Sequence, residues 1–110
     1  MSADLTLDLA PLVIPEPAPT REQRWQAFAA ANPHIERLLV ASARELVNAG
    51  HRRLSMRMLW EHLRFRYATS VLRRDSIAAL NNNHAPFYAK HLMATYPDLA
   101  GVFETRERAA

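Results

Sequence analysis

The side chains of this sequence that could do chemistry are five histidines, several serines and many arginines. The histidines are His34, His51, His62, His84 and His91, and no two form a His-Glu-x-x-His zinc motif. The chain has no cysteine, which excludes thiol catalysis and thiolate metal sites. Its two glycines cannot form a glycine-rich phosphate loop, and no serine has the context of a nucleophile elbow. We therefore predict no catalysis, no bound metal and no cofactor.

Arginine dominates the charge of the chain. Lys90 is the single lysine among the 14 basic residues, and eight arginines lie between Arg44 and Asp75. Residues 1–20 hold three acidic and no basic residues, whereas residues 21–110 hold fourteen basic and eight acidic ones. A guanidinium group binds phosphates and guanine edges through a planar fork of donors. Two interpretations stay open: a real anion-binding face, or arginine used for lysine on an ordinary surface.

Length and composition predict one globular domain. A chain of 110 residues suits a single domain, and 49% apolar with 23% charged residues excludes a wholly disordered chain. No apolar run approaches the ~18 residues of a membrane span. The first twenty residues carry no base, unlike a secretory signal. We expect a cytoplasmic protein without a membrane partner.

The first 19 residues are predicted to form an arm outside the domain. Four of them are proline, and proline removes a backbone donor and keeps the preceding residue extended. We therefore expect a flexible arm over residues 1–19 and a single helical domain over residues 20–110. Apolar residues of the arm could still dock on a partner or on the domain: Leu5, Leu7, Leu9, Leu12, Val13 and Ile14.

Capping signals predict where the first two helices begin. Thr20 and Gln23 have the spacing of a capping box, which starts a helix that runs to about Ala31. Asn32 then serves as the N-cap of a second helix over residues 33–49, with proline at its first position. In this second helix Leu38 and Leu39 lie on the core face, and the side chains predicted to face away are Glu36, Arg37, Arg44 and Asn48. Gly50 ends the helix.

Two further helices and minor β structure follow. Ser55 caps a third helix over about residues 56–67, whose core stripe is Met56, Leu59, Trp60, Leu63 and Tyr67. Asn83 is predicted to cap a fourth helix over residues 84–96, which ends before Pro97. Short strands are predicted over residues 76–80 and 102–105. The fold class is thus mainly α, with about four helices.

The order of these elements predicts a winged helix-turn-helix arrangement, with the fourth helix as the one that enters a DNA groove. Its inward stripe would be Tyr88, Leu92 and Tyr96, joined by Ala85 and Ala89. Its outward stripe would be His84, Phe87, Lys90, His91 and Ala94. The candidate nucleic-acid or anion-binding residues are Arg52, Arg53, Arg57, Arg64, Asn82, Asn83, His84, Phe87, Lys90 and His91. Two features fit a simple helical bundle better: residues 68–83 are long for a turn, and only one strand candidate follows the fourth helix.

Several short motifs carry a resemblance. They are Asn81-Asn82-Asn83, Ala85-Pro86-Phe87-Tyr88-Ala89-Lys90, Tyr96-Pro97-Asp98-Leu99-Ala100-Gly101 and Phe103-Glu104-Thr105-Arg106, with Asn32-Pro33-His34 upstream. Over roughly residues 25–108 the chain resembles short uncharacterised phage and prophage proteins. Lys90 departs from that pattern, in which arginine is more usual. The resemblance implies a phage setting in a bacterial host, where small basic proteins bind DNA or inhibit host machinery.

Three function classes remain, and one structural observation separates the first two. The first is a small non-catalytic DNA-binding or regulatory protein. The second is a protein-binding inhibitor of a host enzyme or defence complex, with an acidic partner; an enzyme accessory subunit is a third. Nucleic acid is favoured if Arg52, Arg53, Arg57 and Arg64 share a face with His84 and Lys90. Scattered arginines beside an exposed apolar patch favour a protein partner.

Overall fold

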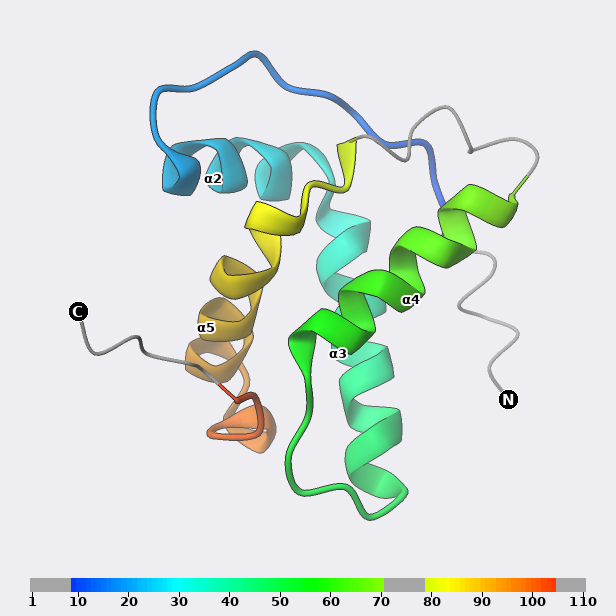
Figure 1. Cartoon of the computed structure of the whole chain (residues 1–110). Coiled ribbons are helices and arrows are strands. Elements are labelled where there is room, and N and C mark those ends of the chain that lie inside the picture. The colour runs from blue at the N-terminus through cyan, green and yellow to red at the C-terminus, as the bar shows by residue number, and fades with distance from the viewer. Residues whose placement is uncertain (1–8, 71–78, 105–110) are drawn as a thin grey trace.

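The computed structural model describes residues 9–70 and 79–104 and is mainly helical (Figure 1). The α-helices are α2 (Arg21–Ala31), α3 (Pro33–Asn48), α4 (Met56–Thr69) and α5 (Ala85–Thr95). Two 3₁₀ turns, η2 (Asn82–His84) and η3 (Pro97–Leu99), flank α5. The predicted fold class, a small helical domain of about four helices, is confirmed.

Within the described residues, β structure is limited to one isolated parallel bridge between Leu54 and Phe103. The Leu54 amide donates to the carbonyl of Val102 at 2.7 Å, and the Glu104 amide donates to the carbonyl of Leu54 at 3.2 Å. The strand predicted over residues 102–105 is therefore reduced to a single bridge in its described part. Most of the strand predicted over 76–80 lies outside the described residues. The winged helix-turn-helix detail is not confirmed.

The predicted starts of the first three helices are confirmed, and at α2 and α4 the predicted cap acts on an amide three residues away. Asn32 precedes α3 as predicted, but its side chain makes no capping bond, so its predicted role as the N-cap is wrong. Thr20 Oγ1 accepts from the Gln23 amide at 3.1 Å, and Gln23 Oε1 accepts from the Thr20 amide at 3.3 Å. Ser55 Oγ accepts from the Met58 amide at 3.1 Å at the start of α4. Gly50, just beyond α3, has a φ of 106°, a conformation that other residues rarely adopt.

The predicted cap of the fourth helix is wrong. Asn81, not Asn83, supplies the capping oxygen: Asn81 Oδ1 accepts from the amide of Asn83 at 2.9 Å. This bond starts η2, and α5 begins only at Ala85, after His84, whose side chain makes no capping bond. The 3₁₀ turn therefore moves the cap two residues upstream. Pro86 lies in the first turn of α5, where its missing amide hydrogen is not needed.

The core lies where α4 packs between α3 and α5. Trp60 and Leu63 are buried as predicted, and Leu39 of α3 is buried with them, whereas Leu46 is half-buried against the core. The other buried apolar residues are Leu12, Phe28, Ile35, Leu38, Val40, Ala43, Leu54, Met56, Leu59, Tyr67, Leu80, Tyr88, Ala89, Leu92, Leu99 and Phe103. The core stripe predicted for the third helix is thus confirmed in full.

Residues 9–13 of the predicted arm pack on the helices. Leu12 is buried in the core, and the hydroxyl of Tyr67 donates to the carbonyl of Ala10 at 2.8 Å. The side chain of Asn32 bonds both the amide and the carbonyl of Val13. The expectation that the whole of residues 1–19 lies outside the core is therefore wrong for this stretch. Its prolines prevent regular structure, but they do not prevent an extended segment from burying a leucine.

Candidate functional site

The predicted DNA-reading end of the fourth helix is occupied by a buried histidine. His84 is 7% exposed, and its ring stacks on Phe28 of α2 with centroids 4.8 Å apart. The ring of Trp60 in α4 meets it edge-on at 6.3 Å. Burial lowers the pKa of the His84 imidazole. His84 is therefore a core residue, and the expectation that it faces outward toward bases or phosphates is wrong.

Two more members of the predicted outward stripe also face other helices. The ring of Phe87 stacks on Trp25 of α2 with centroids 5.7 Å apart. His91 Nε2 lies 2.9 Å from Glu36 Oε1 of α3. Only Lys90 and Ala94 of this stripe are exposed. The predicted outward stripe is thus largely wrong. The prediction assumed that α5 packs on other helices through one side only, whereas α2 and α3 also cover the side that was expected to face solvent.

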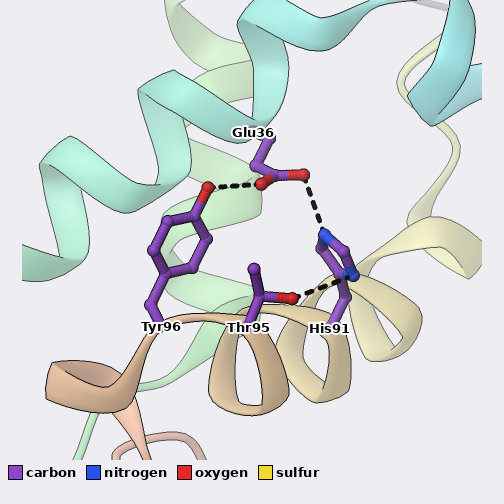
Figure 2. A network of polar contacts seen from close by, with 4 residues as sticks. All are labelled: Glu36, His91, Thr95 and Tyr96. Atoms are coloured by element: carbon purple, nitrogen blue, oxygen red, sulfur yellow. Dashed lines mark hydrogen bonds and ion pairs between the residues drawn. The ribbon is translucent and has the colours of Figure 1, made fainter.

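A polar network joins α3 to the C-terminal end of α5, as Figure 2 shows. The hydroxyl of Tyr96 donates to Glu36 Oε2, while His91 engages the other oxygen of the same carboxylate. Thr95 Oγ1 lies 3.4 Å from His91 Nδ1. The hydrogen bond to Glu36, with burial as a second cause, raises the pKa of the Tyr96 phenol. Glu36 was predicted to face away from the core and instead bonds to two residues around α5.

The same network extends to a surface ion pair. Arg44 Nε lies 2.8 Å from Asp98 Oδ2, and the Arg44 guanidinium sits over the Tyr96 ring, 5.4 Å from its centroid. The hydrogen bond from Arg44 lowers the pKa of the Asp98 carboxyl. These contacts fix η3 against α3. Sequence spacing could not reveal them, since Arg44 and Asp98 are 54 positions apart.

The network places a carboxylate, an imidazole and a hydroxyl side by side in space, from Glu36, His91 and Thr95. This is the order of groups in a nucleophilic triad. The contact between Thr95 and His91 is long, at 3.4 Å, and both are on one helix, four residues apart. Both oxygens of Glu36 are used to hold α5 and Tyr96 against α3. The arrangement therefore serves best as a connection between helices.

Of the arginines predicted for an anion-binding face, Arg57 and Arg64 are on α4, and Arg52 and Arg53 lie in the segment just before it. Arg64 donates to the carbonyl of Leu80 and lies 3.7 Å from Glu61, so it is tied to the segment that leads into η2. Arg52 and Arg53 precede Leu54, which pairs with Phe103 just before the N-terminal end of α4. A helix of the length of α4 spans ~21 Å at 1.5 Å per residue. Arg57 and Arg64 lie three and four positions on either side of Trp60, whose ring contacts His84, whereas Arg52 and Arg53 precede the helix.

The remaining predicted residues are on the surface. Arg52, Arg53 and Arg57 are exposed, and their side chains make no hydrogen bond or ion pair with any described residue. Asn82, Asn83 and Lys90 are exposed as well. Arg57 is thus the one predicted arginine that combines exposure with a place on α4 itself.

The side of α4 away from the core carries two exposed large apolar residues that the sequence analysis did not single out. Met58 is 51% exposed and Phe65 is 63% exposed. They are seven positions apart, so they lie two turns and ~10.5 Å from each other on one face. We call Met58, Glu61, His62, Phe65 and Thr69, all exposed, the α4 outer face. Arg57 and Arg64 form the neighbouring stripe of the helix.

Comparisons with known proteins add no assignment: no family model, no curated protein and no solved structure matches this chain. Among residues 9–70 and 79–104, no helix is long and apolar enough to cross a membrane. In the same residues, no group of three or more histidine and carboxylate side chains is placed to hold a metal ion.

Proposed function

We propose that this chain is a non-catalytic protein-binding module whose α4 outer face docks on an acidic partner. In the phage setting that the motifs imply, it acts in the bacterial cytoplasm as an inhibitor of a host enzyme or defence complex. The single observation that carries this proposal is the exposed pair Met58 and Phe65 beside the arginine stripe of α4. An exposed apolar pair on a helix face supports a protein partner, the second of the two functions weighed from the sequence.

The apolar part of this surface supplies affinity. Large apolar side chains exposed together on one helix face are the anchors by which a helix docks in the apolar groove of a partner. Burying a phenylalanine side chain contributes ~1.5–3 kcal/mol, and aromatic residues beside arginine are frequent among the residues that dominate binding energy. Phe65 is the more exposed of the two and is the expected anchor.

The charge next to the apolar pair points to the chemistry of the partner. Arg57 is exposed beside Met58, and Arg52 and Arg53 extend the positive surface toward the start of α4. Glu61 is the only carboxylate on the α4 outer face, and it lies beside Arg64. A partner that presents an apolar pocket edged by carboxylates would complement this surface and associate faster at low salt.

Phe65→Ser is expected to weaken partner binding about 10- to 100-fold, the equivalent of one buried phenylalanine. It should leave the melting temperature nearly unchanged, because the side chain is already exposed. The measurement has two steps. A photo-crosslinking residue at position 62 captures and identifies the partner from host cells, and calorimetric titration with that purified partner then compares the variants. Met58→Ser should act in the same direction.

Ile14→Ser is the matched control. Ile14 is also an exposed large apolar residue, but it precedes α2 and lies outside the α4 outer face. Unchanged affinity for Ile14→Ser with reduced affinity for Phe65→Ser supports the proposal. Equal affinities for wild type, Phe65→Ser and Met58→Ser would overturn it.

Nucleic-acid binding is the second candidate, and the exposed, unpaired guanidinium groups of Arg52, Arg53 and Arg57 favour it. Each phosphate contact contributes ~0.9 to the slope of log affinity against log salt concentration. If this candidate holds, a fluorescent DNA duplex binds the wild type, and Arg53→Ala or Arg57→Ala lowers that slope by about one. Arg21→Ala, at an exposed cation on α2 outside the predicted set, serves as the control. An absence of duplex binding at low salt removes this candidate and leaves the protein-partner proposal standing.

A further inference from the structure

The unpaired buried polar atoms of the described residues all fall in one place. They are Trp25 Nε1, Trp60 Nε1, His84 Nδ1 and the hydroxyl of Tyr88. Together with Phe28, these residues form what we call the aromatic cluster, between α2, α4 and the start of α5. A buried polar atom without a partner costs about 1–3 kcal/mol, so the cluster is the part of the described core where side-chain hydrogen bonding is least satisfied.

The rings of the aromatic cluster contact one another directly. Tyr88 lies 5.6 Å from both Trp25 and Trp60, measured between ring centroids. His84 joins Phe28 to Trp60, because its ring stacks on Phe28 and meets Trp60 edge-on. In Figure 1, the yellow segment that leads into α5 passes beside α2. His84 is the one member of the cluster that can gain a charge between pH 8 and pH 5.

No described group is placed to stabilise that charge. From α2, His84 meets the ring of Phe28, and from α4 it meets the ring of Trp60. Arg64 of α4 donates to the carbonyl of Leu80, four residues before His84, and a second cation would not stabilise a charged imidazole. From α5 the facing titratable group is the Tyr88 phenol, whose pKa is raised by burial, so it stays neutral. Unlike His91, which has Glu36, His84 has no carboxylate partner.

The direction of the pH effect follows from this environment. Burial lowers the pKa of His84 in the folded state below its ordinary value of 6.5. Above pH ~6.5 the imidazole is neutral in both states and does not affect stability. Below that pH the His84 imidazole is protonated in the unfolded state but stays neutral in the folded state. The free energy of unfolding therefore falls as the pH drops from 6.5 toward the folded-state pKa.

We propose that His84 is an acid-sensitive latch: protonation of its imidazole releases η2 and the first turn of α5 from α2 and α4 and exposes the aromatic cluster. The released segment is short, and Asn81, Asn82 and Asn83 beside it are already exposed. A single 3₁₀ turn has few hydrogen bonds to lose, so local opening there is easier than unfolding of α3 or α4. The latch does not depend on the proposed function of the α4 outer face.

The two tryptophans of the chain, Trp25 and Trp60, both belong to the aromatic cluster and report its exposure. We expect the tryptophan emission of the wild type to shift to longer wavelength on acidification, with a midpoint below pH ~6.5. His84→Phe keeps a stacking ring that cannot be protonated and should abolish the shift. His62→Gln, His34→Gln and His91→Gln change the other described histidines of the helices and should retain it.

Three results would overturn the latch. The first is an emission shift in His84→Phe equal to that of the wild type. The second is an emission shift that is lost in His34→Gln but kept in His84→Phe. The third is a wild-type emission that stays constant down to pH 5. Should His84→Phe fail to fold at pH 8, nuclear magnetic resonance of the wild type decides. A titration midpoint of the His84 ring protons below ~6.5 that coincides with the emission change supports the latch. A midpoint at or above that value contradicts it.

Discussion

Replacing Trp60 by alanine is expected to lower the free energy of unfolding by ~3–5 kcal/mol. Trp60 is 1% exposed, and its ring packs on Tyr88 and against His84. Truncation would leave a cavity where α4 meets the start of α5, and the surrounding rings are too rigid to fill it. Urea denaturation at pH 7.5, where the lowered pKa of His84 keeps its imidazole neutral, measures the change.

Two variants on the same helix act as controls for Trp60. Trp60→Phe retains an aromatic ring and removes the unpaired indole N–H, so it should cost less than Trp60→Ala. Phe65→Ala removes a ring of similar type from the exposed face and should change stability by no more than about 0.5 kcal/mol. A near-neutral Trp60→Ala together with a costly Phe65→Ala would mean that α4 is rotated and that Trp60 belongs to a surface.

Asn32→Ala is expected to cost ~2–3 kcal/mol, a large effect for a residue between two helices. Asn32 is 0% exposed. Its Oδ1 accepts from the Val13 amide at 2.7 Å, and its Nδ2 donates to the carbonyls of Val13 at 2.8 Å and Phe28 at 3.0 Å. Alanine removes these bonds and leaves the Val13 amide without a partner beside the core. Thermal and urea denaturation give the change in stability.

A shortened chain tests how Asn32 acts. In a chain that begins at Ile14, the Val13 partner is absent, and the cost of Asn32→Ala should fall to that of the bond to the Phe28 carbonyl alone. Asn83→Ala, at an exposed asparagine, is the matched control and should cost little. An equal cost of Asn32→Ala in the long and the short chain would show that the contact with residues 9–13 contributes nothing to stability.

The sequence by itself determined the features that depend on a few neighbouring residues. The capping oxygens of Thr20 and Ser55 act on amides three positions away, and the backbone at Gly50 needs a φ that glycine adopts most easily. The core stripe of α4, centred on Trp60 and Leu63, follows from the 3.6-residue period alone. Helix number, most helix starts and the buried side of α4 were therefore predictable.

Only the tertiary structure decided the roles of side chains whose partners are distant in sequence. Asn32 occupies the predicted N-cap position, yet its side chain turns to Val13, 19 positions away, and makes no capping bond. Glu36 has the spacing of a solvent-facing residue, yet it meets His91 across 55 positions.

The same distinction explains the candidate site. Periodicity states which residues of a helix share a side, but it does not state how many sides other helices cover. Because α2 and α3 both pack on α5, His84 and His91 point into the protein. Because nothing described packs over the outer side of α4, Met58 and Phe65 remain exposed. The number of helices that pack on each helix thus decided which of its apolar residues are buried and which are exposed.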